Sequence, residues 1–319
     1  MTTTALSRAD PTAPFHEGEK ALQAYTGSRA KLEEVGSRVI RPAMPEQHRS
    51  FFAQLPFMVI GLVDAQGQPW ASVLAAPPGF VQSPDDRHLD IAALPLPNDP
   101  AAAALTAGAS IGLLGIEPHT RRRNRVNGMV GRVGPDGFSV NVRQSFGNCP
   151  KYIRTREAVF VAPRGRAAEA ERGDRLDENA MRFIAQADTF FIATAHSAAQ
   201  SGDGASAHGV DVSHRGGPRG FVQVVDDRTL VAPDYLGNFF FNTLGNLLVN
   251  PRAGLLFIDY ETGDLLHVAV TVGIVQDGPE VAAHEGAQRL LWMQVAQMQR
   301  LPSGLPLRWS EPVSLPLGR

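Results

Sequence analysis

The sequence has a single cysteine, Cys149, so it cannot form an intrachain disulfide. It also lacks a marked charge of either sign, because 30 basic and 32 acidic residues leave a net charge of −2. No overall field would therefore attract nucleic acid or an anionic membrane surface. These absences favour a small-molecule partner, with no nucleic acid and no membrane.

Long apolar runs are missing as well. The first twenty residues, MTTTALSRADPTAPFHEGEK, have no apolar core of the kind found in signal peptides. No uninterrupted apolar stretch is long enough to cross a bilayer. These features, with the lack of disulfides, predict a cytoplasmic protein. The residues up to about Ala13 are polar and have no period, which predicts disorder.

The chain does have length and apolar content, with 319 residues of which 43% are hydrophobic, enough for two domains with cores. A repeated stretch also favours two units. PPGFVQSPDDRHLDIA at 77–92 and PRGFVQVVDDRTLVA at 218–232 share Gly-Phe-Val-Gln, Asp-Asp-Arg and Leu without a gap. Each copy has the pattern of a β-hairpin, in which two apolar runs flank an Asp-Asp turn.

The elements around the two hairpins follow the same order. A helix and a strand precede each hairpin, PEQHRSFFAQL-PFMVIGLVD in the first half and DENAMRFIAQA-TFFIATA in the second. Pro45 is expected at the first helical position and Asp177 as an N-cap. A helix and a strand also follow each hairpin, PNDPAAAALTAG-ASIGLLGIEP and GNFFFNTLGNLLVNP-RAGLLFIDY. We therefore predict a mainly β (α+β) protein with two antiparallel units of five or six strands.

The ends of these patterns give the expected boundaries. A helical stretch from Glu17 to Val39, interrupted near Gly27, precedes the first unit, and HEGAQRLLWMQVAQMQRL after the second is also predicted to be helical. The expected parts are an N-terminal extension and helix at 1–45, the first unit at 46–153, a linker at 154–176, the second unit at 177–277, and a C-terminal helix with an extended tail at 278–319.

Common cofactor and metal motifs are weak. Gly202, Gly204 and Ala207 fit a dinucleotide fingerprint, but no helix is expected after them, and that motif binds phosphate at a helix N-terminus. His208 and Asp211 would point to opposite faces of an extended strand, and there is no His-Glu-x-x-His motif. We therefore expect no metal site.

Three polar clusters are candidates for binding an anion. The first is the run of Arg121–Arg123 and Arg125, which is either a solvated turn or a set of guanidinium groups that bind phosphate or carboxylate. The second is Ser213-His214-Arg215, just before the second hairpin. The third is Asn242-Thr243 at a helix start, where free N–H groups favour phosphate, although an ordinary N-cap is the alternative. The second and third clusters would converge at the open end of the hairpin.

The order of elements and several strings resemble the FMN-binding split-barrel family of pyridoxamine 5′-phosphate oxidase and its relatives. These strings are NPRAGLLFIDYETGDLLHVAV, GLLGIEPHTRRRNRVNGMVGRV, QSFGNCPKYI and DVSHRGG. The resemblance covers about Gln47 to Tyr152 and Asn179 to Val275. It implies two tandem six-stranded antiparallel split β-barrels with flanking helices, an intramolecular pseudo-dimer with FMN at its interface, and it is compatible with a further homodimer.

The resemblance also implies positions for cofactor-binding residues. In the family, basic and hydroxyl residues on the hairpin strands and at the following helix hold the FMN phosphate. Those positions correspond here to Ser213, His214, Arg215, Asn242 and Thr243. The residue that contacts the flavin ring falls near Asn124 or Arg125 in the first half, with Arg123 in the same run, and on His267 in the second half.

The sequence departs from the oxidase pattern in places. The Ser-Arg-Lys of the oxidase falls near Phe241-Asn242-Thr243, and the C-terminal substrate-binding Arg and His have no clear counterpart. The first half has WASVLAAP where the second has GVDVSHRG, so one of the two sites is expected to be degenerate. The resemblance implies an FMN-dependent oxidoreductase for a small molecule, with a reductase or other electron donor. A non-catalytic flavin-binding or sensor protein and a degenerate barrel with a structural role stay open as alternatives, and no catalytic residue is assigned.

Overall fold

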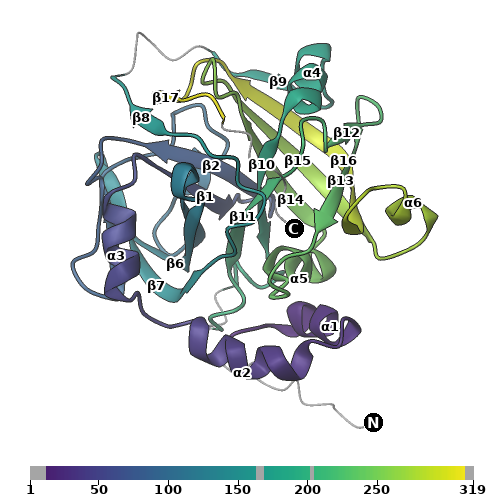
Figure 1. Cartoon of the computed structure of the whole chain (residues 1–319). Helices are drawn as coiled ribbons and strands as arrows, with labels where there is room; N and C mark the ends of the chain where they lie inside the picture. Colours follow the sequence, from purple (N-terminus) through teal and green to yellow (C-terminus); the bar gives the residue numbers. More distant parts are fainter. Residues whose placement is uncertain (1–11, 163–168, 202–204, 313–319) are drawn as a thin grey trace.

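The computed structural model describes residues 12–162, 169–201 and 205–312 (Figure 1). The main regular structure is two large antiparallel sheets, with helices around them. The prediction of a mainly β protein built from two tandem split barrels is therefore confirmed. In the described part of the chain, no helix is both long and apolar enough to span a membrane.

The first barrel is a seven-stranded sheet in the order β2-β1-β5-β6-β7-β4-β3. The helix α3 (Glu46–Ala53) leads into it, with Pro45 as the N-cap and not as the first helical residue. Its strands are β1 (Phe57–Val63), β2 (Pro69–Ala75), β3 (Val81–Gln82), β4 (His88–Ile91), β5 (Ser110–Glu117), β6 (Arg122–Gly134) and β7 (Gly137–Gly147). The helix expected in PNDPAAAALTAG is only one 3₁₀ turn, η1 (Ala102–Ala104).

The second barrel repeats this strand order as β11-β10-β14-β15-β16-β13-β12. Its helices are α4 (Glu178–Gln186), capped by Asp177 as predicted, α5 (Asn242–Val249) and α6 (Pro279–Ala282). Its strands are β10 (Thr189–Ala195), β11 (Val210–Gly216), β12 (Gln223–Val224), β13 (Thr229–Tyr235), β14 (Arg252–Ile258), β15 (Leu265–Val275) and β16 (Ala287–Leu301), and β9 (Glu171–Gly173) adds to the edge of β16.

The prediction of a helix in HEGAQRLLWMQVAQMQRL is wrong, because β16 is a 15-residue strand. It pairs with β13 on one side and with β15 on the other. Leu291, Met293 and Val295 are buried, whereas Trp292 and Gln294 between them are exposed, so the period is two and not 3.6. The abundant Leu, Met and Gln favour a helix locally, but tertiary pairing decides, and the second sheet extends beyond residue 277.

The segment between the barrels and the tail form a small structure of their own. The strand β8 (Ala158–Phe160), within the expected linker, pairs with β17 (Leu307–Trp309) from the Pro-rich tail. The disorder expected in the N-terminal segment falls mainly on residues 1–11, which lie outside the described part of the chain. The glycines of the weak dinucleotide fingerprint, Gly202 and Gly204, also lie outside it.

The two barrels share an apolar interface that includes side chains from β1 and β5 on one side and from β10 and β14 on the other. Close backbone approach requires glycine at two matching positions. A Cβ atom on Gly112 would lie 2.7 Å from the carbonyl oxygen of Val210, and one on Gly254 would lie 2.2 Å from that of Pro69. Each barrel thus presents a glycine of its own Gly-Leu-Leu run to a strand of the other barrel.

The N-terminal helix α1 (Glu17–Tyr25) lies against the second barrel, next to α5 in Figure 1. The predicted break occurs at Gly27, where φ is +67°, and α2 (Arg29–Val39) follows. Gly18 lets α1 approach α5, because a Cβ atom there would lie 2.2 Å from the carbonyl oxygen of Gly245. The first turn of α1 is therefore fixed against the first turn of α5.

Candidate functional site

A pocket lies where β6 of the first barrel meets β11, β13 and the start of α5 in the second. Its volume is about 960 Å³ when space open to solvent is included. The sequence candidates that line it are Arg123, Arg125, Ser213, His214, Arg215, Asn242 and Thr243. Residues far apart in the sequence, and from both barrels, therefore form one site.

Arg125 lies at the centre of the polar part of this pocket. Its Nη2 donates to Ser213 Oγ over 2.6 Å, and its Nη1 donates to Asn242 Oδ1 over 3.1 Å. The same Nη1 lies 2.9 Å from a carboxylate oxygen of Asp211. Thr243 completes the group by donating its hydroxyl to Ser213 Oγ over 2.8 Å. A cation and two hydroxyl groups are thus held together at the N-terminus of α5.

Positive charge exceeds negative charge around the pocket. Arg215 and Arg289 both pair with Asp234, with Arg289 Nη1 at 2.7 Å from Oδ2, and Arg125 pairs with Asp211. Arg123 donates its Nε to the carbonyl oxygen of Cys149 over 2.7 Å. Four guanidinium groups and the Lys151 ammonium therefore face two carboxylates, which leaves three positive charges for a ligand. A phosphate carries up to two negative charges and suits such a site.

His214 adds no charge to this balance. Burial, followed by the nearby guanidinium groups of Arg123 and Arg215, holds the pKa of His214 well below its usual value. The imidazole is therefore neutral at physiological pH, and its Nδ1 lies 3.3 Å from Arg123 Nη1. Burial also lowers the pKa of Arg123, to about 10, so this guanidinium still carries its charge near neutral pH.

Several donors in the pocket have no acceptor. The Nε atoms of Arg125, Arg215 and Arg289 are buried and have no hydrogen-bond partner. The N-terminus of α5 is not capped by a side chain, and its N-cap residue, Phe241, has a φ of +62°. Buried donors in proteins are nearly always paired, and uncapped helix starts bind anions. The residues present therefore fit an oxyanion such as a phosphate group.

The opposite wall of the pocket is aromatic. Tyr152 stacks on Tyr235, with ring centroids 5.2 Å apart and planes at 25°, and Tyr152 donates its hydroxyl to the carbonyl oxygen of Leu236 over 3.1 Å. Phe239, 37% exposed, follows in the loop that leads to α5. Tyr152 and Phe239 have φ values of +65° and +61°, a conformation that is costly for bulky residues and is concentrated at ligand sites.

Two of the candidates lie elsewhere. Asn124 is buried on β6, and His267 is fully buried on β15, so neither lines the pocket. The arginine run is divided, because Arg121 forms a left-handed turn and is exposed, whereas Arg123 and Arg125 line the pocket. Arg289 was not predicted as a site residue, because its stretch favours a helix in the sequence. It lies on β16, which brings it to Asp234.

Strand pairing identifies the positions in the other half of the pseudo-dimer that match the pocket. Ile192 pairs with Ser213, as Ile60 pairs with Ser72. Arg125 lies opposite Leu114 of the neighbouring strand, as His267 lies opposite Leu256. The residues that match Ser213, His214, Arg215, Arg125 and Arg123 are therefore Ser72, Val73, Leu74, His267 and Leu265.

This matching position has no room or charge for an anion. Ser72 donates its hydroxyl to Asp99 Oδ2 over 2.5 Å, and His267 Nε2 lies 3.5 Å from the same oxygen. His267 Nδ1 lies 3.0 Å from the carbonyl oxygen of Ala71. All these side chains are buried. Ser72 contacts the Asp99 carboxylate, whereas the matching Ser213 contacts the Thr243 hydroxyl. The two strings therefore belong to different kinds of site. GVDVSHRG lines an open polar pocket, whereas WASVLAAP contributes Ser72 to a closed Ser-Asp-His cluster.

The floor of the pocket is held from behind by α1. Glu19 Oε1 accepts a hydrogen bond from Asn242 Nδ2 over 2.5 Å, and Glu19 Oε2 accepts one from the backbone N of His16 over 2.8 Å. Burial raises the pKa of Glu19 to about 8, with these hydrogen bonds opposing the shift. A buried carboxyl group therefore orients Asn242, which in turn faces Arg125.

Comparisons with known proteins agree with this fold. Residues 44–162 match the family model described as pyridoxamine 5′-phosphate oxidase. No curated protein matches the sequence. Among solved structures, an FMN-binding protein from Syntrophomonas wolfei subsp. wolfei is 14% identical and is similar over 42% of this chain and 82% of its own, with a TM-score of 0.26.

Two further solved structures have a similar extent. HupZ from Group A Streptococcus is 15% identical over 39% of this chain and 92% of its own, with a TM-score of 0.29. HutZ from Vibrio cholerae, described as a heme storage protein, is 14% identical over 43% of this chain and 95% of its own, with a TM-score of 0.24. Likeness at this level carries no argument about a ligand. The match of residues 44–162 supports a relationship of the first barrel to the pyridoxamine 5′-phosphate oxidase family.

Proposed function

We propose that this protein binds FMN in the pocket between its barrels and acts as a flavin-dependent oxidoreductase on a small molecule. The observation that carries the proposal is the excess of donors in the pocket, where four guanidinium groups face two carboxylates. Three of these arginines also have an unpartnered Nε atom. A phosphorylated cofactor would neutralise this charge and supply the missing acceptors.

The roles of the chain's residues follow from their places in the pocket. Ser213, Thr243 and Arg125, next to the uncapped start of α5, would hold the phosphate group. The stacked pair of Tyr152 and Tyr235 offers a flat surface that would exclude water from one side of the site. Bound flavin supplies two-electron redox chemistry, and the protein supplies binding and orientation.

The neutral imidazole of His214 limits proton transfer within the pocket. Since its pKa is held well below the usual range by burial, this side chain would not donate a proton at physiological pH. Protons would then come from the substrate or from water. A separate electron donor or a reductase is the partner that such a site requires.

The binding proposal is tested by comparing FMN with riboflavin, which lacks the phosphate group. We expect Thr243→Val and Ser213→Ala to weaken FMN binding about tenfold each, since a hydrogen bond to a charged group contributes about 1.5–3 kcal/mol. Riboflavin affinity is expected to stay the same. Ser72→Ala, at the matched position of the first barrel, is the control and is expected to leave FMN affinity unchanged. Equal losses of affinity for FMN and riboflavin would show that Ser213 and Thr243 do not bind the phosphate group.

The redox part is tested separately on the FMN complex. NADH and NADPH are added anaerobically, and bleaching of the bound flavin is followed by absorbance against free FMN at the same concentration. Reduction faster than that of free FMN, followed by reoxidation, supports an oxidoreductase. Tight FMN binding without accelerated reduction by either donor favours a flavin-binding protein without turnover.

A further inference from the structure

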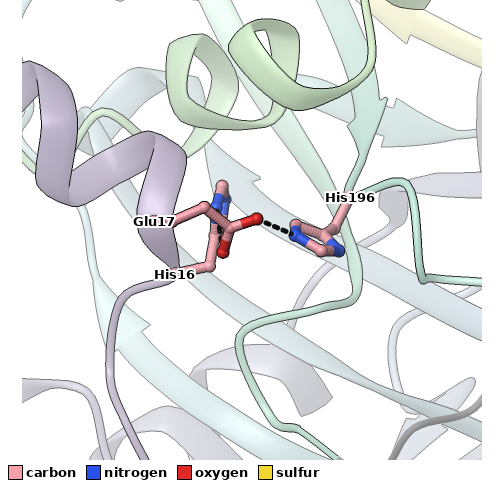
Figure 2. A group of neighbouring side chains, drawn as sticks. All are labelled: His16, Glu17 and His196. Carbon is pink, nitrogen blue, oxygen red and sulfur yellow. Dashed lines mark hydrogen bonds and ion pairs between the residues drawn. The ribbon is translucent and has the colours of Figure 1, made fainter. Parts of the chain in front are cut away.

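A second polar cluster lies outside the pocket, where the start of α1 meets the end of β10. His16 is the N-cap of α1, Glu17 is its first residue, and His196 follows β10 directly. Figure 2 shows the Glu17 carboxylate between the two imidazole rings. One ligand atom from each of these three residues lies within 4.8 Å of the other two. His16 and Glu17 are neighbours in the sequence, whereas His196 lies 179 residues after Glu17.

The distances place the nitrogens around a single carboxylate. Glu17 Oε1 lies 3.0 Å from His196 Nε2, and Glu17 Oε2 lies 4.0 Å from His16 Nδ1. A third imidazole, that of His208, stacks on His196 with ring centroids 3.9 Å apart and planes at 8°, and its Nε2 is 3.8 Å from Glu17 Oε2. The stacking fixes the plane of the His196 ring and therefore the direction of its nitrogens.

Three imidazole groups lie around the one Glu17 carboxylate, so they cannot all form ion pairs with a separate acid. The His16 side chain is 2% exposed and lies beside two other imidazoles, so a cationic ring there would be buried. The neutral ring is the form in which histidine binds metal ions. Only Glu17 carries a firm negative charge in the cluster, and 65% of its side chain is exposed, so an ion has access from solvent.

We propose that His16, Glu17 and His196 bind a divalent transition-metal ion of the Zn²⁺ class, with water in the remaining coordination position. Two imidazoles and a carboxylate are a ligand set that such ions prefer. Ligand atoms bound to one Zn²⁺ ion lie about 2.0–2.2 Å from it, so Glu17 Oε1 and His196 Nε2 are already suitably spaced. His16 must move inward by about 1 Å.

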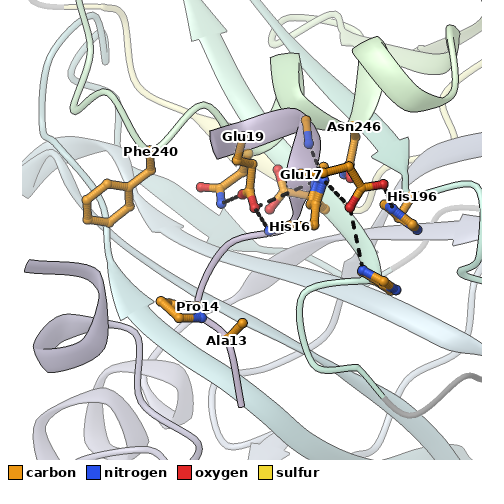
Figure 3. A network of polar contacts seen from close by, with 12 residues as sticks. Ala13, Pro14, His16, Glu17, Glu19, His196, Phe240 and Asn246 are labelled. Carbon is orange, nitrogen blue, oxygen red and sulfur yellow. Dashed lines mark hydrogen bonds and ion pairs between the residues drawn. The ribbon is translucent and has the colours of Figure 1, made fainter. Parts of the chain in front are cut away.

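The protonation states show what binding requires. His16 Nδ1 accepts from the backbone N of Gly18 over 3.1 Å, so in the neutral ring the proton is on Nε2. Nδ1 has a single lone pair, and the ion would replace the Gly18 N–H as its partner. Nε2 lies 3.6 Å from Glu19 Oε2, and a carboxyl oxygen behind a ligating histidine is a common supporting contact (Figure 3). His16 would therefore bind through Nδ1 without a change of tautomer.

His196 does require such a change. Its Nδ1 accepts from the backbone N of Ala198 over 3.1 Å, so the proton is on Nε2, facing Glu17. Binding through Nε2 moves that proton to Nδ1 and ends the contact with Ala198. No proton is lost in this exchange. The cost is the neutral hydrogen bond from Ala198 and the charge-assisted one to Glu17 Oε1, which are together small compared with the affinity of zinc sites.

The position of the ion follows from its ligands. It would join the first turn of α1 to the second barrel, next to the α1–α5 contact that carries Glu19 and Asn242. The ion would thereby hold the N-terminal helices in place behind the pocket. This proposal does not depend on flavin binding.

The test uses the full-length protein without a histidine tag, stripped of metal with a chelator and titrated with Zn²⁺ by calorimetry. We expect one ion per chain and a rise in Tm on binding. Glu17→Gln, an exposed and isosteric change, and His196→Ala are expected to lower the affinity at least about tenfold and to abolish the rise in Tm. His119→Gln, a half-exposed histidine on another surface, is the matched control and is expected to behave as the unmodified chain.

The outcomes distinguish the alternatives. Absence of saturable binding near one equivalent overturns the proposal, and so does a Glu17→Gln protein that binds Zn²⁺ as tightly as the unmodified chain. Because Glu17 is exposed, this variant is expected to fold even if His196→Ala does not. Circular dichroism of each metal-free variant verifies the fold before titration.

Discussion

Arg125 and His267 occupy matching positions in the two barrels, but only Arg125 faces an open pocket. Arg125 lies opposite Leu114 and reaches Ser213 and Asn242, whereas His267 lies opposite Leu256 and is enclosed beside Asp99. The pseudo-symmetric fold therefore places Arg125 where a ligand has access and His267 in a closed core. This difference and the contacts of α1 lead to four predictions.

The first prediction concerns stoichiometry. We expect one FMN per chain, because the matching position has a carboxylate at Asp99 and apolar Val73 and Leu74 in place of His214 and Arg215. Calorimetric titration, combined with the absorbance of the released flavin, gives the ratio. Two equivalents per chain would contradict the closed Ser-Asp-His cluster, since a second phosphate would need to displace Asp99.

The second prediction concerns the stability provided by Asp99. Its carboxylate accepts from Ser72 Oγ over 2.5 Å and from the backbone N of Ala101 over 2.8 Å. Asp99→Ala leaves both buried donors unpaired, and we expect the free energy of unfolding to fall by about 2–4 kcal/mol. Urea denaturation measures the change. The control is Asp136→Ala in an exposed turn, expected to be within about 0.5 kcal/mol of the unmodified protein. A similar small effect for both would mean that water replaces the Asp99 contacts.

The third prediction concerns pH. Burial raises the pKa of Glu19 from 4.5 to about 8, so the folded chain keeps this proton where the unfolded chain has lost it. The resulting stability is present below pH 4.5 and is lost as the pH rises to about 8. Burial lowers the pKa of His16 from 6.5 to about 3, and that contribution is lost as the pH falls below 6.5. The two oppose each other between pH 4.5 and 6.5, and Glu19 acts alone above 6.5.

We therefore expect the free energy of unfolding to decrease by about 1–2 kcal/mol between pH 6.5 and 8, since the limiting slope is about 1.4 kcal/mol per pH unit. Glu19→Gln removes the titrating group and is expected to flatten this part of the curve. Urea denaturation at half-unit intervals provides the comparison. A variant that retains the full slope would show that another group titrates in this range.

The fourth prediction concerns the contact between α1 and α5. Gly18→Ala would place a Cβ atom 2.2 Å from the carbonyl oxygen of Gly245, so the backbone must shift. We expect a loss of about 1–3 kcal/mol in the free energy of unfolding and weaker FMN binding, because Glu19 would no longer orient Asn242. Gly273→Ala is the control, since its nearest atom is the carbonyl oxygen of Trp292 at 3.9 Å. Unchanged FMN affinity in Gly18→Ala would show that the position of α1 does not affect binding in the pocket.

Much of the fold could be predicted because local patterns and tertiary structure agree. The two hairpins at 77–92 and 218–232 combine apolar alternation with Asp-Asp turns, and both form. The convergence of Ser213 with Thr243 could also be anticipated, because both lie at the open end of one hairpin. The prediction for β16 was wrong for the opposite reason. Its residues favour a helix, and only pairing with β13 and β15 makes it a strand.

The site was less accessible from the sequence wherever it depends on contacts between distant segments. No local pattern shows that Arg125 of the first barrel meets Ser213 of the second, or that Arg289 shares Asp234 with Arg215. The cluster of His16, Glu17 and His196 is even harder to predict from the sequence. The N-terminal pair resembles an ordinary helix start, and the imidazole that completes the cluster comes from the second barrel.

The pocket takes Arg125 from one barrel and Ser213 from the other, but a single chain supplies both. A binding site shared by two separate subunits disappears when dilution separates them. In a covalent pair the barrels remain at a fixed effective concentration, whatever the amount of protein present. We therefore expect any ligand affinity of this pocket not to change when the protein is diluted.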